Sequence, residues 1–293
     1  MVAVMKTPAG EARRPRPGGA QSPGAVKEVS SVANPVVKEI AGLALAKNRK
    51  ASGRFIAEGL KLVADGVDAG WAIDTLVYAA AAGAQPLVQR LAATCHARGG
   101  RVLSVTDAVL AKISRRDNPQ TVIGIFHQRL TAPETIRPTA EDVWVALEQV
   151  RDPGNLGTIV RTADAVGAAG VILIGATVDP FSPEAVRATM GSIFHVALAK
   201  ASAPAFATLA GRWPGRIVGT HLAAPTDYRS EDYTGPVLLV MGGEQAGLSP
   251  AVADLCGALV RIPMTGRADS LNLAVATGVM LFEIARDRLR GDG

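Results

Sequence analysis

Two glycine-containing loops near the C-terminus carry polar residues directly after apolar runs. The first, Gly242-Gly243-Glu244-Gln245-Ala246-Gly247, follows the run 237–241, and the second, 265–272, follows the run 259–264. Short apolar runs bounded by turn residues indicate buried parallel strands. Because open α/β sheets bind ligands beyond the carboxyl ends of their strands, the two loops are candidate walls of one ligand site.

A third polar segment, Asp152-Pro153-Gly154-Asn155, has the chemistry of a turn that starts a helix. We expect Asn155 to be the N-cap of a helix through about residue 166, with Arg161 on its second turn. A guanidinium can clamp a phosphate through two hydrogen bonds and stabilise negative charge that develops on an oxygen. Because a lone helical arginine is usually just solvated, Arg161 is a candidate only together with the two loops.

Other common kinds of site are absent from the sequence. It contains no G-x-x-x-x-G-K-[ST], G-x-G-x-x-G or G-x-S-x-G motif. The four histidines and two cysteines show no metal-binding spacing, so no metal is expected. No apolar stretch reaches the roughly 18 residues of a membrane span, and the N-terminus lacks the apolar core of a signal peptide. These features disfavour nucleotide hydrolysis, dinucleotide redox chemistry and membrane insertion, and they predict a cytoplasmic protein.

Charge is distributed unevenly along the 293 residues. Residues 1–130 contain 18 Lys and Arg against 9 Asp and Glu, whereas residues 131–293 contain 13 against 17. This asymmetry favours a first part that faces a polyanion and a second part that binds a small ligand. The alternative is that the basic side chains only solvate the surface.

The same asymmetry accompanies a division into segments. Residues 1–30, rich in Pro, Gly, Ala and Arg, are predicted to be a disordered basic tail. Residues 31–130 alternate strand and helix patterns, which predicts a small α/β domain. Residues 131–142 are the expected linker, and 143–293 form the expected second domain, a parallel sheet with helices on both faces.

A basic cluster lies at the end of the helix expected to start at Asn34-Pro35. Its tightest part is Lys47-Asn48-Arg49-Lys50, and Arg54 follows. Cations at a helix C-terminus complement the helix dipole, which is the simpler explanation. The excess of positive charge in so short a stretch favours contacts with RNA phosphates by Lys47, Arg49, Lys50 and Arg54.

Three motifs in order carry a family resemblance. They are Asn155-x-Gly157-x-x-x-Arg161, then Gly242-x-Glu244-x-x-Gly247, then Ile262-Pro263-Met264-x-Gly266-x-x-x-Ser270-Leu271-Asn272-x-x-x-Ala276. Together they resemble the signature motifs of the SpoU (TrmH-like) RNA 2′-O-ribose methyltransferases of the SPOUT superfamily. The segment from Asn34 to Gly59 resembles the substrate-binding domain that precedes many SpoU catalytic domains and is related in fold to the ribosomal protein L30e.

The resemblance implies S-adenosylmethionine as cofactor and assigns roles to the matching positions. Cofactor-binding positions are Gly242, Ile262, Met264 and Leu271. Arg161 would be the catalytic arginine near the acceptor ribose, and the other positions expected to act there are Asn155, Glu244, Ser270 and Asn272. The alternatives are that Asn155, Ser270 and Asn272 only cap helices and that Glu244 is a solvated turn residue.

The resemblance also implies an assembly and a substrate. SpoU catalytic domains have a C-terminal trefoil knot and act as homodimers. In this chain, 271–285 is apolar nearly all round, so we expect it to pack on its own sheet and on a partner subunit. The expected substrate is 23S rRNA in preference to tRNA, and the alternative function is that of a non-catalytic RNA-binding ribosome assembly factor.

Overall fold

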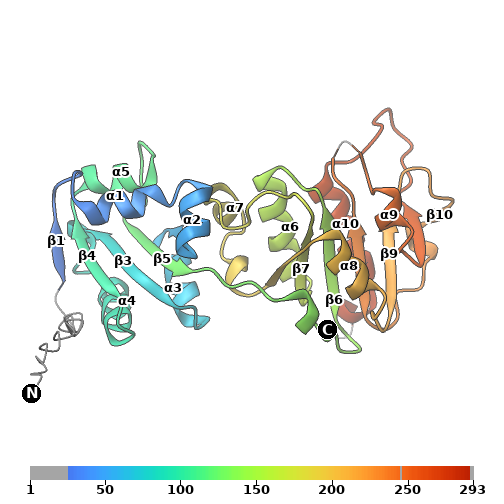
Figure 1. Ribbon diagram of the computed structural model, residues 1–293, viewed down its shortest axis with the longest axis horizontal. Helices are drawn as coiled ribbons and strands as arrows, with labels where there is room; N and C mark the ends of the chain where they lie inside the picture. The colour runs from blue at the N-terminus through green and yellow to red at the C-terminus, as the bar shows by residue number, and fades with distance from the viewer. Residues whose placement is uncertain (1–25, 245, 291–293) are drawn as a thin grey trace, which may run out of the picture.

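The computed structural model describes residues 26–244 and 246–290, which form two α/β units side by side (Figure 1). Most of the predicted tail, residues 1–25, lies outside the described residues. The end of that tail is not disordered as predicted, because β1 (Lys27–Val29) pairs in parallel with β4 (Arg101–Val105). The first unit therefore begins before residue 30.

The first unit is a five-stranded sheet in the order β1-β4-β3-β5-β2. Strands β1, β4 and β3 are parallel, and β5 and β2 complete the sheet in antiparallel pairings. The predicted alternation of strands and helices is present. Its other elements are α1 (Pro35–Gly42), α2 (Ala46–Ser52), β2 (Arg54–Glu58), α3 (Leu60–Asp68), β3 (Ile73–Ala79), α4 (Pro86–Ala97), α5 (Asp107–Ser114) and β5 (Val122–His127).

The second unit is a seven-stranded, fully parallel sheet in the order β10-β12-β9-β11-β6-β7-β8. Two of its strands, β8 (Ala197–Ala201) and β10 (Thr226–Asp227), were not predicted. Its other strands are β6 (Val143–Glu148), β7 (Gly170–Ile174), β9 (Arg216–Thr220), β11 (Val237–Met241) and β12 (Ala258–Arg261). Its main helices are α6 (Pro153–Ala165), α7 (Pro183–Ala188), α8 (Ala203–Ala210), α9 (Pro250–Ala253), α10 (Leu273–Ile284) and α11 (Arg286–Arg290).

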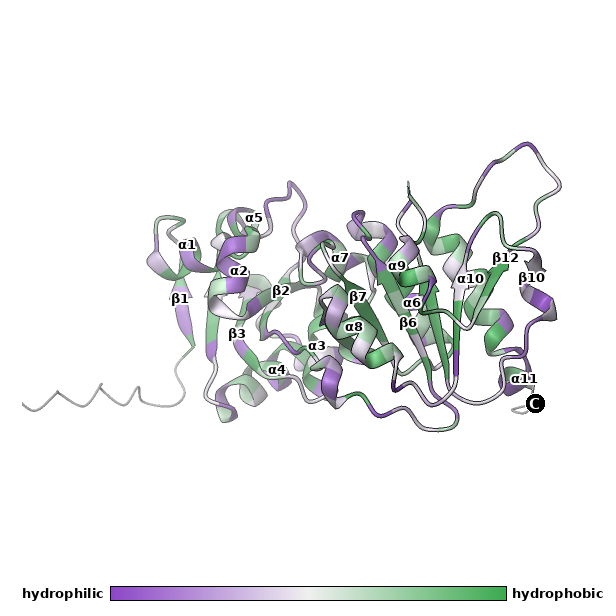
Figure 2. Cartoon of the chain, turned by 45° about the vertical axis from the view of Figure 1, so that its right-hand side comes forward, coloured by the Kyte–Doolittle hydropathy of each residue, from purple (hydrophilic) through white to green (hydrophobic). Residues whose placement is uncertain are grey.

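Helices cover both faces of this sheet, as predicted. Side chains alternate across a strand, so Val143, Val145 and Leu147 of β6 join the core that includes α6 and α10. Trp144 and Ala146 join a second cluster with α8 and α9 on the opposite face. Figure 2 shows the resulting band of apolar strands between helices. The carboxyl ends of the central strands then position the loops that were singled out in the sequence.

The two units share one continuous hydrophobic core. Five aromatic rings meet at the junction with centroid separations of 4.9 to 6.2 Å: Phe55, Trp71 and Phe126 from the first unit, and Phe181 and Phe194 from the second. The Trp71 Nε1–H also donates to the Phe194 carbonyl at 3.0 Å. The units are therefore packed against each other directly and are not joined by the connecting segment alone.

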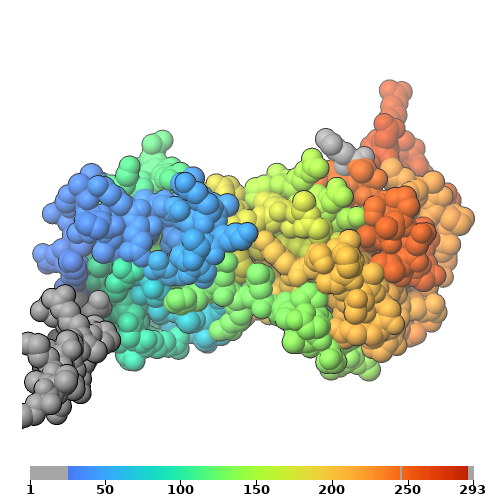
Figure 3. Space-filling model, in the orientation of Figure 1, coloured from blue at the N-terminus to red at the C-terminus, as the bar shows by residue number. Residues whose placement is uncertain are grey.

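The predicted linker, 131–142, runs along the surface from one unit to the other (Figure 3). It is fastened to the second unit, because Thr131 forms a bridge with Ala199 of β8 and Ile136 is buried beside α8.

In the second sheet, β9 lies between β12 and β11. The trefoil knot stays a prediction. No helix within the described residues is long and apolar enough to cross a membrane.

Candidate active site

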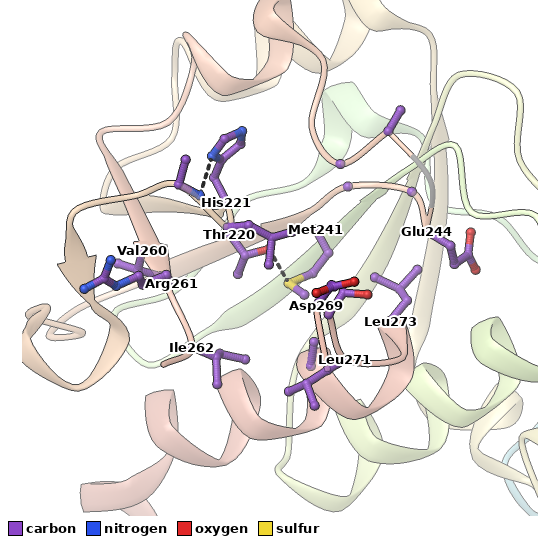
Figure 4. A pocket seen from close by; sticks show the side chains of 18 of the residues that line it. Thr220, His221, Met241, Glu244, Val260, Arg261, Ile262, Asp269, Leu271 and Leu273 are labelled. Atoms are coloured by element: carbon purple, nitrogen blue, oxygen red, sulfur yellow. Dashed lines mark hydrogen bonds between the residues drawn. The ribbon is translucent and has the colours of Figure 1, made fainter. Parts of the chain in front are cut away.

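A cavity of about 420 Å³ opens at the carboxyl ends of β11, β9 and β12. The four positions expected to bind the cofactor, Gly242, Ile262, Met264 and Leu271, all line it. In Figure 4 Glu244 lies on one side of the cavity, Arg261 and Ile262 on the other, and Met241, Asp269 and Leu271 between them. The structure thus brings the two glycine-containing loops together as walls of a single site.

Residue 242 has to be glycine, because the backbone of residues 247 and 248 passes directly beside it. A Cβ atom at this position would lie 2.0 Å from the Gly247 carbonyl carbon and 2.2 Å from the Leu248 nitrogen. Since these are backbone atoms, no side-chain movement can relieve the overlap. The loop from 242 to 247 folds back tightly enough to form a wall only because residue 242 has no side chain.

Another wall of the cavity was not predicted. Thr220, His221, Leu222 and Ala223, which follow β9, also line it. Thr220 Oγ1 donates to the Met241 sulfur at 3.4 Å, and His221 Nδ1 accepts from the Ala223 nitrogen at 3.2 Å. The apolar pair Ile217-Val218 indicates a strand just before these residues, but the sequence does not say which strands are neighbours in the sheet.

Asn155 is not the N-cap of its helix, which corrects the prediction. Helix α6 begins at Pro153, and the Asp152 carboxylate caps it by accepting from the Asn155 nitrogen at 2.6 Å. Carboxylates are good helix N-caps and proline is favoured at the first helical position. The Asn155 side chain is thereby released for other contacts.

Those contacts join three of the expected catalytic residues in a chain of hydrogen bonds. Asn155 Nδ2 donates to Glu244 Oε1 at 3.0 Å, and Asn272 Nδ2 donates to Asn155 Oδ1 at 3.0 Å. Asn272 Oδ1 accepts from the Ala274 and Val275 nitrogens, so this residue caps α10 and also belongs to the site. The Glu244 carboxylate thus contacts Asn155, and no hydrogen bond joins it to Arg161 within the described residues. Ser270 lines the first cavity.

A second cavity, of about 480 Å³, lies on the other side of the 242–247 loop. Four residues of that loop line both cavities: Gly243, Glu244, Ala246 and Gly247. Asn155 and Asn272 line only the second cavity, together with Gln149, Arg151 and Asp152 from the segment that follows β6. The chain of hydrogen bonds therefore starts at Glu244, which both spaces share, and continues along the lining of the second cavity.

Arg161 is not brought to this boundary within one chain. It lies on the exposed side of α6, lines neither cavity, and forms no hydrogen bond or ion pair with a described residue. Thr162 beside it faces Gly278 of α10. Arg161 therefore lies near the surface that α6 and α10 present together, and its catalytic role stays a prediction.

The predicted RNA-binding cluster divides into two kinds of residue. Lys47 and Lys50 are exposed on α2. Arg49 is buried, and its guanidinium binds Asp179 of the second unit at 2.8 Å and the Leu43 and Ala44 carbonyls. Arg54, with a side chain 16% exposed, binds Glu39 and Asp74. The prediction of phosphate contacts is corrected for Arg49, whose donors are occupied inside the fold, and Arg54 is committed to two carboxylates.

The first cavity suits S-adenosylmethionine on the chemistry of its lining. Ile262, Met264 and Leu271 offer apolar surface, the backbone of 242–244 and 246–247 offers amides and carbonyls, and the Asp269 carboxylate offers negative charge to a sulfonium. Within the described residues, no group of three or more His, Cys, Asp and Glu is arranged to hold a metal ion.

Solved structures and curated relatives resemble the whole two-unit arrangement. The AdoMet-bound rRNA methyltransferase from Sinorhizobium meliloti is 54% identical, with a TM-score of 0.86 over 90% of this chain and 99% of that one. The 23S rRNA (uridine(2479)-2′-O)-methyltransferase of Streptomyces viridochromogenes is 32% identical over 83% of this chain and 86% of its own length. The 23S rRNA (guanosine(2553)-2′-O)-methyltransferase of Bacillus subtilis is 26% identical over 88% and 99%.

Two family models divide the chain as its two units do. Residues 34–124 match the MRM3-like substrate binding domain, and residues 142–282 match the SpoU rRNA Methylase family. The resemblance drawn from the three motifs is thereby confirmed, and so is the small α/β domain that precedes the parallel sheet. On its motifs, its fold and its similarity to these proteins, the chain belongs to the SpoU family of RNA methyltransferases.

Proposed function

We propose that this protein transfers a methyl group from S-adenosylmethionine to a ribose 2′-hydroxyl of 23S rRNA. The observation that carries the proposal is the lining of the first cavity by all four expected cofactor positions, with Glu244 at its boundary with a second, polar cavity. Relatives that span both units are 23S rRNA 2′-O-methyltransferases, and a similar solved structure holds AdoMet. We place the reaction in the cytoplasm.

The donor supplies a methyl group that its sulfonium already activates, so the protein has to position the acceptor and exclude water. The 2′-hydroxyl must lose its proton during the transfer. Glu244 Oε1 is fixed by Asn155, while Oε2 forms no hydrogen bond with a described residue and can accept one from the hydroxyl. Asn272 holds Asn155 in turn. We assign these three residues to positioning of the ribose.

Arg161 remains the proposed source of positive charge at the acceptor. Its guanidinium is exposed and unpaired within the described residues, so it is free to bind an RNA phosphate and to stabilise charge on the 2′-oxygen. Arginine keeps its own proton in proteins, so it does not act as the base. Arg161→Ala is expected to lose methyl transfer nearly completely while the protein stays folded.

A homodimer is part of the proposal. Along α10, Val275 and Phe282 are 53% and 52% exposed, and Gly278 and Val279 between them are partly exposed. These positions form one apolar stripe at helical spacing, which a second copy would cover. Phe282→Asp should convert the dimer to a monomer in analytical ultracentrifugation. Leu130→Asp, at a position of similar exposure away from α10, should leave the dimer intact.

The substrate is tested by mapping ribose methylation across total RNA from cells with and without the gene. We expect the loss of one mark in 23S rRNA. Loss of a mark from tRNA alone would refute the choice of substrate. Calorimetry of the purified protein with S-adenosylmethionine separates the enzyme from an RNA-binding assembly factor, since a protein that only assists assembly would show no binding.

A further inference from the structure

We propose that the second cavity is the pocket for the target nucleotide and that Gln149 reads its base while Arg151 binds an adjacent phosphate. This inference rests on the proposed function, since it names the ligand of the space beside the expected cofactor site. Neither Gln149 nor Arg151 belongs to the three motifs. Both lie on the segment between β6 and α6, at the carboxyl end of a central strand.

The position of the cavity is the first argument. It shares Gly243, Glu244, Ala246 and Gly247 with the cavity that suits the methyl donor, so only one loop separates the two spaces. A ribose at that loop would place its base and its phosphates inside the second cavity or at its mouth. The lining there is polar and suits a nucleotide: Gln149, Arg151, Asp152, Asn155, Glu244 and Asn272.

The backbone of Gln149 is the second argument. Its φ is 54°, in the left-handed region that non-glycine residues rarely adopt. Its nitrogen donates to the Ile174 carbonyl at 3.3 Å, and its carbonyl packs against Gly243, where a Cβ would lie 3.3 Å away. Glycine would adopt this conformation without strain. Strained residues of this kind cluster at ligand sites, which suggests that the side chain at 149 has a use.

The free donors and acceptors are the third argument. Asp152, Asn155 and Asn272 are committed to one another, to Glu244 or to backbone amides. By contrast, the exposed Gln149 carboxamide forms no hydrogen bond with a described residue, and Arg151 forms neither a hydrogen bond nor an ion pair with one. A carboxamide both donates and accepts, as the edge of a base does, and a guanidinium matches a phosphate.

Asn155 and Asn272 therefore hold the shape of the pocket and Glu244 faces the ribose, whereas Gln149 and Arg151 are left to contact the base and a phosphate. Sequence-specific proteins commonly take an unstacked base out of an RNA loop and bind its edges. We assign Gln149 to the choice of base and Arg151 to affinity, since a phosphate carries no sequence information.

The test uses the full-length protein and a short, unmethylated RNA hairpin that contains the target nucleotide found by mapping. A second hairpin is abasic at that nucleotide. Wild-type protein should bind the intact hairpin at least about tenfold more tightly than the abasic one, and Gln149→Gly should reduce this ratio to about threefold or less. Arg151→Gln should weaken binding to both hairpins equally and lower the salt dependence by about one phosphate contact. Gln89→Ala, at an exposed glutamine on α4, should change nothing.

Gln149→Gly is chosen because it removes the carboxamide without adding strain, so a lost ratio cannot be ascribed to a distorted backbone. Retention of the full ratio by Gln149→Gly would overturn the assignment, as would a selective effect of Arg151→Gln on one hairpin. Calorimetry with S-adenosylmethionine should give unchanged affinity for both variants, since neither residue lines the first cavity. If wild-type protein binds no S-adenosylmethionine, the proposed function fails; if it binds while Gln149→Gly still discriminates, only this inference fails.

Discussion

Replacement of Arg49 by alanine should destabilise the protein strongly without removing an RNA contact. Its side chain is 4% exposed and its partner Asp179 is 26% exposed. Removal of one member of a buried ion pair costs about 3 to 5 kcal/mol, because the other charge stays buried without a partner. Partial exposure of Asp179 places this case near the lower limit.

Two further hydrogen bonds are lost in the same variant. Arg49 Nη1 donates to the Leu43 and Ala44 carbonyls at 2.8 and 2.9 Å, in the connection between α1 and α2. The hydrogen bond to the Leu43 carbonyl is buried, so its loss adds about 1 kcal/mol, whereas water can replace the donor at the partly exposed Ala44 carbonyl. We therefore expect Arg49→Ala to lower the free energy of unfolding by about 4 kcal/mol.

Urea denaturation followed by tryptophan fluorescence measures the effect, with Lys50→Ala as the matched control. Lys50 is the next residue on α2 and is exposed, so its loss should change stability by less than about 0.5 kcal/mol. RNA affinity should show the reverse order: when both variants are folded, Lys50→Ala should bind RNA more weakly than Arg49→Ala. A cost below about 1 kcal/mol for Arg49→Ala would refute the role assigned to this ion pair.

Three further predictions follow from other parts of the structure. Joint replacement of Lys47 and Lys50 by alanine should weaken binding of an rRNA fragment and reduce the slope of log affinity against log salt by about 0.7 to 0.9 per lost contact. The control Lys200→Ala, at an exposed lysine on β8, should leave both unchanged. An unchanged slope for the double variant would refute the phosphate contacts of α2. Gly242→Ala should abolish S-adenosylmethionine binding in calorimetry, because its Cβ would overlap the backbone at 247–248. The control Gly266→Ala should retain binding, since its Cβ would meet nothing within 4 Å. Equal affinities of the two variants would contradict this account of the loop. Burial raises the pKa of Glu58 above the ordinary value of a glutamate, against the opposing effect of Arg187 and Arg116. The stabilising effect of the protonated carboxyl is therefore present below the ordinary pKa and is lost as the pH rises through the raised pKa. Glu58→Gln should match wild-type stability near pH 4 and exceed it at pH 7, and parallel pH profiles of unfolding free energy would show this reasoning to be wrong.

The two loops that line the first cavity could be located from sequence because their signals are local, whereas the four cofactor positions within them are what the family resemblance implies. Gly242 and the residues of the second loop follow buried strands directly, and strand ends of a parallel sheet gather at one edge. Apolar runs also predict β6, β7, β9, β11 and β12. The two-residue β10 contains no apolar residue, and the apolar run 196–199 at β8 ends at Lys200 within the strand.

What the sequence could not reveal depends on partners far away in the chain. Arg49 and Lys50 are adjacent and chemically alike, yet one is buried because Asp179 lies opposite it after 130 residues of chain. Asn155 looked like a helix cap because the pattern allowed either Asp152 or Asn155 to take that position. Thr220 and Gln149 became part of the site only through the order of strands in the sheet, which periodicity does not determine.

The junction between the units bears on how RNA is selected. Trp71 donates to the Phe194 carbonyl, Arg49 binds Asp179, and buried rings from both units pack together. A core that is continuous across two units resists rotation of one against the other, since packed interiors yield little to strain. The separation between the Lys47 and Lys50 surface and the second cavity is then fixed by the fold. With the two RNA contacts proposed above, an RNA has to present a phosphate to Lys47 and Lys50 and an accessible nucleotide to the second cavity at the same time. A folded segment of defined shape can do so, whereas a flexible single strand does so only at an entropic cost.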